Sequence, residues 1–237
     1  MRRNFAITGL AAAALATSIV LPATSSAAIQ ELGKIPAGVR GSCPEAGVTV
    51  EPVPADEGCQ ALTKLTVYQA KVGPDRGLYK APADGRIVAW SIALGKPGPK
   101  QAEFFANRYG KDPQAALVVL SPRKKLSREV TAKAPMETLT DYLGESVQFP
   151  LRKSLPISKG QYVGLTVPTW VPAMQLGLPS DTSWRSSRDK SGCFDYTTQF
   201  GLLGRRNSAF FPCLYRHVRL TYSATFISNP AKPSSKK

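Results

Sequence analysis

The chain has 237 residues, with 31 Lys and Arg against 16 Asp and Glu and a single His, so its formal net charge is +15. This length suits one modest domain, and 43% hydrophobic residues suffice to build a core, which excludes a wholly disordered chain. One His, with no H-E-x-x-H or C-x-x-C pattern, excludes the common histidine- and thiolate-rich metal sites, so we expect neither a metal nor a cofactor.

The first 28 residues predict a signal peptide. Arg2 and Arg3 precede an uncharged, Ala- and Leu-rich run over residues 5–21, and small residues at 25–28 follow as a cleavage site. A membrane span is the alternative, but Pro22 ends the run. The arginine pair also fits part of a twin-arginine export signal. We therefore expect a secreted, extracellular protein without a transmembrane segment in its mature form, whose 29 basic and 16 acidic residues leave a net charge of +13.

Four cysteines remain in the mature chain: Cys43, Cys59, Cys193 and Cys213. An even count in an exported chain predicts two disulfides, and three pairings are possible. We favour the local pairing, Cys43 with Cys59 and Cys193 with Cys213, because neighbouring segments usually meet first. Four free thiols, buried as small apolar side chains, are the alternative.

Composition divides the mature chain into three parts. Residues 29–60 form a lead-in and a disulfide-tied segment rich in Gly and Pro, residues 61–228 hold the strand patterns, and residues 229–237 form a basic tail whose composition predicts disorder. The tail and lead-in therefore flank a single domain.

Short apolar runs bounded by Gly and Pro fill the domain, and they predict strands. Following the chain, we expect strands at 65–68, 86–94, 115–120, 147–149, 162–167 and 214–226. The only helix expected is a short one over 101–109. Many short strands with frequent turns predict an all-β, two-sheet β-sandwich, jelly-roll-like, whose strand order stays open.

Two of these runs predict burial in detail. The run over 86–94 is apolar on both faces, so it predicts a central strand with a buried Trp90. The run over 214–226 alternates, which places one set of side chains in the core and the other in solvent. The set expected in the core is Leu214, Val218, Leu220 and Tyr222.

Four stretches carry a family resemblance: GRIVAWSIA at 85–93, YVGLTVPTW at 162–170, DTSWR at 181–185 and RLTYSAT at 219–225. Together they resemble a group of uncharacterised exported β-rich proteins of soil actinobacteria. The resemblance covers most of residues 61–226 and implies an exported single domain of an actinobacterial type. It implies no activity.

Catalysis finds little support in the chain. A Ser-His-Asp triad would need His217, the only imidazole, and no G-x-S-x-G elbow supplies a nucleophile. Acids crowd near aromatic residues only at Asp181, Asp189 and Asp195, where a glycoside hydrolase could find its two carboxylates. The interleaved Arg and Lys residues would lower the carboxylate pKa values, whereas a general acid needs a raised one. No D-x-D-x-D spacing indicates calcium.

The segment from 181 to 207 is the best candidate for binding. It is polar, carries one large aromatic residue and runs into a loop that a disulfide would tie down, and ordered loops are where binding residues concentrate. The alternative is that Trp184 packs on the edge of the sandwich; we expect it to be accessible. The candidate ligand-binding residues are Asp181, Trp184, Arg185, Arg188 and Tyr196.

Basic clusters at 123–128, 152–153 and 205–206 fall at expected turns. Nucleic acid is not an expected partner, because the chain is exported and shows no nucleic-acid motif. We favour a non-catalytic binding module for a glycan or polyanion of the cell envelope or the environment. A polysaccharide hydrolase using carboxylates within 181–195 and a purely structural secreted protein are the alternatives, and the oligomeric state stays open.

Overall fold

The computed structural model describes residues 27–39, 41–43 and 59–230. Nearly all of the expected signal peptide, the segment between the first two cysteines and the last seven residues of the tail lie outside these ranges. The strands are β1 (Ile29–Leu32), β2 (Leu62–Lys71), β3 (Gly85–Ala93), β4 (Gln114–Pro122), β5 (Ser127–Lys133), β6 (Glu137–Thr138), β7 (Ser146–Ile157), β8 (Tyr162–Val171), β9 (Met174–Gln175), β10 (Ser183–Ser186), β11 (Ser208–Phe210), β12 (Cys213–Arg216), β13 (Arg219–Leu220) and β14 (Tyr222–Ser228).

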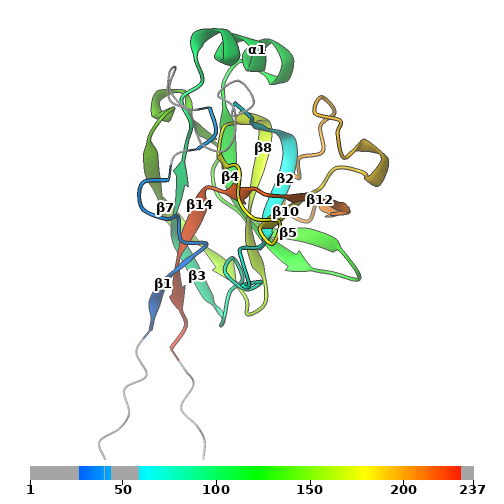
Figure 1. Cartoon of the computed structure of the whole chain (residues 1–237). Coiled ribbons are helices and arrows are strands. Elements are labelled where there is room, and N and C mark those ends of the chain that lie inside the picture. The colour runs from blue at the N-terminus through cyan, green and yellow to red at the C-terminus, as the bar shows by residue number, and fades with distance from the viewer. Residues whose placement is uncertain (1–26, 40, 44–58, 231–237) are drawn as a thin grey trace, which may run out of the picture.

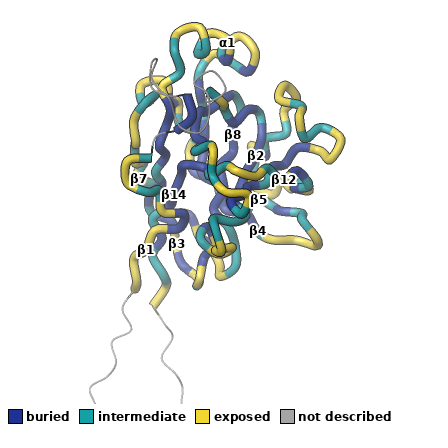
Figure 2. Tube along the Cα trace, viewed as in Figure 1, coloured by how far each residue is buried: buried dark blue, intermediate teal, exposed yellow. Residues whose placement is uncertain are grey.

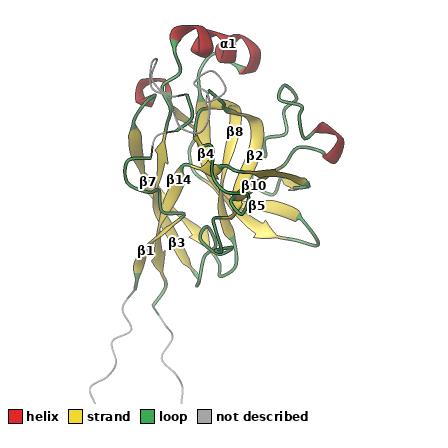
Figure 3. Ribbon diagram, viewed as in Figure 1, coloured by secondary structure: helices red, strands yellow, loops and turns green. Residues whose placement is uncertain are grey.

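The strands form two antiparallel sheets that pack against each other (Figures 1 and 3). The smaller sheet has the order β1-β14-β3-β7, and the larger has the order β11-β5-β4-β8-β2-β10-β12, with β6 paired to β4. A two-stranded ribbon of β9 and β13 lies outside both sheets. The expected all-β sandwich is confirmed. The sequence left the strand order open. In the structure, strands that follow each other in the chain, such as β2 and β3, lie in different sheets, so chain order does not predict strand order.

The core lies between the two sheets (Figure 2). Its side chains come from the inward faces of β3 and β14 on one side and of β2, β4 and β8 on the other. Trp90 is fully buried there, with its ring centroid 4.9 Å from that of Phe149. The predicted burial of Trp90 is therefore confirmed, and its strand runs from Gly85 to Ala93, one residue earlier at each end than expected.

One α-helix occurs in the described residues, α1 (Pro99–Tyr109), with short 3-10 turns at Thr140–Tyr142 and Lys190–Gly192. Proline at its first position suits a helix start, and the backbone N–H of Gly98 donates to the side chain of Gln101 at 2.8 Å. On its buried face, Phe105 stacks on Trp170 with ring centroids 5.0 Å apart. The expected short helix is confirmed and lies at one end of the sandwich (Figure 1).

The expected long strand over 214–226 is wrong. The structure divides it into β12, β13 and β14, and it places β12 in the larger sheet and β14 in the smaller one. A chain that changes sheets must bend, and it does so at His217, whose φ is 65°. Leu220 and Tyr222 are buried as expected, but Leu214, before the bend, is 38% exposed.

Both local disulfides, Cys43–Cys59 and Cys193–Cys213, are confirmed. Two disulfides point to an oxidising environment. Within the described part of the chain, no helix is both long enough and apolar enough to cross a bilayer.

The basic clusters are not all at turns. Residues 123–125 and 205–206 do lie at turns, but Arg152 and Lys153 lie on β7, an edge strand of the smaller sheet. Charged side chains on an edge strand discourage pairing with another chain. Arg128 lies on β5 and is only 8% exposed, with its guanidinium 5.1 Å from the ring centroid of Tyr68.

Candidate functional site

The region predicted to bind ligand is built around β10. This strand pairs with β2 on one side and with β12 on the other, so it lies inside the larger sheet. The segment 187–212, named here the disulfide loop, leaves β10 and returns to β12 (Figure 1). The Cys193–Cys213 bond ties this loop to the sheet.

Trp184 is only 5% exposed, so the expectation that it is accessible is wrong. Its side chain belongs to the core between the sheets. Its ring stacks on that of Tyr215, the residue opposite it on β12, with centroids 4.1 Å apart and planes 17° apart. The stack leaves Trp184 no open face on that side for a sugar ring.

Arg188 is 1% exposed, so it cannot be the surface ligand contact that the sequence suggested. Its Nη2 donates to the carbonyl of Thr63 at 2.9 Å and to the Thr63 hydroxyl at 3.0 Å, and its Nη1 donates to the Tyr215 hydroxyl at 3.3 Å. The Tyr196 ring lies over the guanidinium at 4.8 Å. Arg188 therefore fixes the start of the disulfide loop to Thr63 and Tyr215 from inside the protein.

The remaining candidates lie apart from one another. Arg185 is half-buried and donates to the carbonyls of Phe211 and Pro212, at 3.1 and 3.0 Å, which holds the end of the disulfide loop against the sheet. Asp181 precedes β10, whereas the loop that carries Tyr196 follows it. The structure brings Tyr196 and Arg188 together, and Trp184 joins them only through Tyr215.

The carboxylate of Asp195 is committed to a turn. It accepts hydrogen bonds from the backbone N–H and hydroxyl of Thr197, both at 2.9 Å, and from the backbone N–H of Thr198 at 3.0 Å. Hydrogen bonding from Thr198, and then from Thr197, holds the pKa of Asp195 well below its usual range. A general acid needs the opposite shift. Among the described residues, no group of three or more His, Cys, Asp or Glu side chains could hold a metal ion.

The disulfide loop exposes one predicted candidate, Tyr196, together with side chains outside the predicted set of ligand-binding residues. Phe194 is 78% exposed and Tyr196 is 42% exposed, and Lys190, Arg205 and Arg206 are also exposed. Within the described ranges the one ion pair joins Arg123 to Glu129, at 2.6 Å, so these three cations form none there. The loop therefore presents aromatic faces and uncompensated positive charge together.

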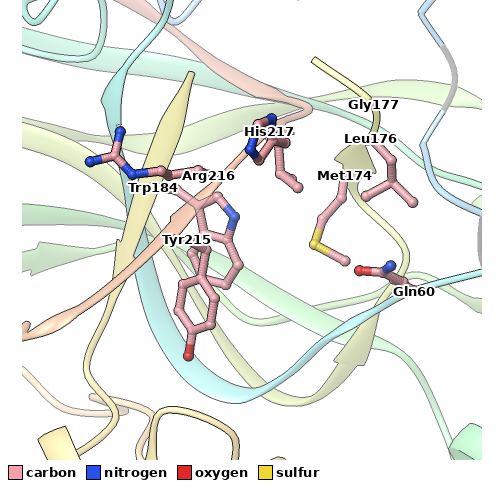
Figure 4. A pocket seen from close by; sticks show the side chains of 9 residues that line it. Gln60, Met174, Leu176, Gly177, Trp184, Tyr215, Arg216 and His217 are labelled. Atoms are coloured by element: carbon pink, nitrogen blue, oxygen red, sulfur yellow. The ribbon is translucent and has the colours of Figure 1, made fainter. Parts of the chain in front are cut away.

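A pocket of about 400 Å³ opens beside Trp184, at the junction of β9, β10 and β12 (Figure 4). We name it the Trp184 pocket. Its volume falls in the range of small-molecule sites, about 300–1,000 Å³. Its lining is mostly apolar and consists of Gln60, Met174, Leu176, Gly177, Trp184, Tyr215, Arg216, His217 and Val218.

The indole N–H of Trp184 is buried and has no hydrogen-bond partner within residues 27–39, 41–43 and 59–230. In Figure 4 the indole nitrogen lies on the edge of the ring that is turned toward Met174. The indole of Trp90 also lacks a partner, but Trp90 is enclosed between the sheets and lines no part of this pocket. Of these two indoles, that of Trp184 is the one whose ring lines a pocket.

His217 is held rigidly in the pocket wall. Its backbone N–H donates to Thr182 and its carbonyl accepts from Leu178, both at 2.9 Å, which fixes a left-handed conformation that is uncommon outside glycine. Its Nδ1 lies 2.9 Å from the carbonyl of Leu178, which can only accept, so Nδ1 carries the hydrogen. In the neutral ring, Nε2 is then an acceptor.

The sequence did not predict this pocket. Its residues come from four separate stretches of the chain, and the ribbon that carries Met174 is too short to show a periodicity. The one available signal was the single histidine, which the sequence placed on a solvated strand face.

The chain matches no family model, and it has no match to a curated protein or to a solved structure. The resemblance to exported actinobacterial proteins therefore stays a prediction.

Proposed function

We propose that the protein is a secreted binding module that retains a glycan or anionic polymer of the cell envelope without cleaving it. One observation carries this proposal: the exposed aromatic rings of Phe194 and Tyr196 lie on a disulfide-tied loop that also exposes Lys190, Arg205 and Arg206. Secretion rests on the expected signal peptide, and the two disulfides agree with it.

The chemistry of the disulfide loop suits such a polymer. Aromatic faces offer large apolar area to sugar rings, while Lys and Arg attract carboxylate and phosphate groups. Three cations without a carboxylate partner create a local positive potential, and the net charge of the whole chain adds to it. The loop is anchored at Arg185 and Cys213, so binding would order few additional residues.

Binding is favoured over hydrolysis because of Asp195. Hydrolysis by two carboxylates requires one of them to hold a proton at neutral pH, and the hydrogen bonds of Thr197 and Thr198 favour the ionised form of Asp195. The described residues that line the Trp184 pocket include no carboxylate. A purely structural role makes no use of the exposed rings and cations on the loop.

The test is retention on purified Gram-positive cell walls. We expect the wild-type protein to bind at low salt, and we expect a variant with Lys190, Arg205 and Arg206 all changed to Gln to lose most of that retention. The matched control changes Arg152, Lys153 and Lys159 to Gln, which removes the same charge from β7 and its following turn in the other sheet.

Each result decides the proposal. Phe194→Ala should reduce the retention that survives high salt, because stacking is not screened. Equal loss in the loop variant and the control would overturn the assignment to the disulfide loop. Release of soluble oligosaccharide that stops in Asp181→Asn or Asp195→Asn would overturn the non-catalytic assignment in favour of the hydrolase.

A further inference from the structure

We infer that the Trp184 pocket binds the N-acyl group of an amino sugar, with the carbonyl on the Trp184 N–H, the amide N–H on His217 Nε2 and the methyl group against Met174, Leu176 and Val218. This inference rests on the proposed function in one respect, namely that the ligand is a glycan. It names the sugar chemistry that the pocket would select.

The first step is the unpartnered donor. Buried N–H groups are nearly always hydrogen-bonded, and an exception asks for an explanation. The indole of Trp184 lies on a pocket wall, it is held there by the stack on Tyr215, and its N–H finds no acceptor among the described residues. Because the indole nitrogen is itself covered from solvent, a ligand oxygen would reach this donor once the flexible side chain of Met174 moves aside.

The second step is the acceptor on a second ring of the pocket lining, that of His217. The Leu178 carbonyl occupies the Nδ1–H of His217, and no described residue bonds Nε2. Two backbone hydrogen bonds hold this exposed residue at a φ of 65°, and the contact of Nδ1 with the Leu178 carbonyl orients its ring. Strained backbone tends to cluster at ligand sites, and here it places an imidazole in a pocket wall.

The third step is the apolar wall. Met174 is buried, and Leu176 and Val218 are half-buried; together they offer the pocket aliphatic and thioether surface with no hydrogen-bonding group except the weak acceptor of sulfur. Figure 4 shows the side chains of Met174 and Leu176 across the pocket from the indole. A polar group placed there would lose its water without a replacement partner, whereas a methyl group would lose nothing.

One small chemical group meets all three demands. A secondary amide carries an acceptor, a donor and, in an N-acetyl group, a methyl, all in one plane. A hydroxyl supplies the acceptor and donor but leaves the apolar wall uncovered. A free amine is charged at neutral pH, so it cannot accept from the indole, and a carboxylate has no hydrogen for His217 Nε2.

The experiment is a titration of the full mature protein with N-acetylglucosamine and its trimer, followed in ¹H–¹⁵N spectra by the indole N–H signals. The chain has three tryptophans, and Trp184→Phe assigns the signal of Trp184. We expect this signal to shift on titration and the N-acetyl methyl protons to receive saturation from the protein. Glucosamine and glucose are the controls, and neither should shift it comparably.

Two conservative variants test the individual contacts. Trp184→Phe keeps an aromatic ring on Tyr215 but removes the donor, and His217→Asn keeps a residue that tolerates positive φ but removes the imidazole. Each should weaken binding of the trimer about tenfold, the effect of losing one hydrogen bond. Arg152→Gln, on β7 in the other sheet, should leave trimer binding unchanged.

The outcomes separate this inference from the proposed function. Retention on cell walls with no response of the Trp184 signal to the trimer would overturn the inference and leave the proposed function standing. Trimer binding without any retention on walls would do the reverse. An equal response to glucose would refute the selection for an N-acyl group.

Discussion

The most informative stability experiment replaces Trp90 first by Ala and then by Phe. The side chain is fully buried between the sheets and packs on Phe149. Replacing a buried Trp by Ala costs about 3–5 kcal/mol, from lost transfer free energy and the cavity left behind. Domains are stable by only about 5–15 kcal/mol, so this single change removes a large share of the total.

Phe at the same position should cost much less. The indole N–H of Trp90 has no partner, and a buried unsatisfied donor carries a penalty of about 1–3 kcal/mol that Phe removes. Removing this penalty offsets part of the free energy that is lost with the smaller side chain. We therefore expect the free energy of unfolding of Trp90→Phe, but not that of Trp90→Ala, to lie within about 2 kcal/mol of the wild-type value.

The assay is urea unfolding followed by far-UV circular dichroism with the disulfides intact. The free energy of unfolding is extrapolated to water, and an unchanged slope shows that both variants expose the same surface. A Trp90→Ala variant within 1 kcal/mol of wild type, or a Phe variant as unstable as the Ala variant, would refute the packing described for β3.

Three further predictions concern individual side chains. Burial raises the pKa of Tyr79 from 10 to about 12, so between these values the folded protein keeps a proton that the unfolded chain loses. The contribution of Tyr79 to the free energy of unfolding should therefore be fully present below pH 10 and should be lost between pH 10 and 12. A urea midpoint of the wild-type protein that does not change across this window would contradict the prediction. Replacing Cys193 and Cys213 by Ser should cost about 3 kcal/mol by the chain-entropy argument, measured by the same unfolding, and no change would mean that the loop is already ordered in the unfolded chain. The carboxyl carbon signal of Asp195 should show no titration above pH 4 in an NMR titration, and a midpoint above pH 5 would revive it as a general acid.

The sequence predicted the fold where a strand stays in one sheet. Residues 86–94 are apolar on both sides, which predicted a central strand, and β3 does lie between β14 and β7 within its sheet. The run over 214–226 also alternates, but the chain crosses between sheets at His217, and the crossing resets which side faces inward. A periodic pattern describes the two faces of a single strand and does not reveal where the chain passes from one sheet to the other.

The candidate site was predicted less well, because polar residues can be buried when the backbone satisfies them. Asp, Ser and Arg around Trp184 indicated a surface position. In the structure Ser187 accepts from the N–H of Thr66 at 2.9 Å and donates to the carbonyl of Phe200 at 2.6 Å, beneath the disulfide loop. These partners are distant in sequence, so nothing local distinguishes a buried serine of this kind from an exposed one.

The sequence located the positive charge of this region better than it located the exposed aromatic side chains. The exposed rings are Phe194 and Tyr196 rather than Trp184, and the exposed cations are Lys190 and Arg205 rather than Arg188. The exposed side chains that could bind a polymer therefore lie farther along the chain, on the disulfide loop.

The measurement that tests the central claim most directly is retention of the wild-type protein on purified cell walls as the salt concentration rises. Exposed charges are screened beyond about 8 Å at physiological ionic strength. We predict strong retention at low salt, a steep fall as salt increases, and a residual fraction at high salt that Phe194→Ala removes. No retention at any salt concentration would contradict the account.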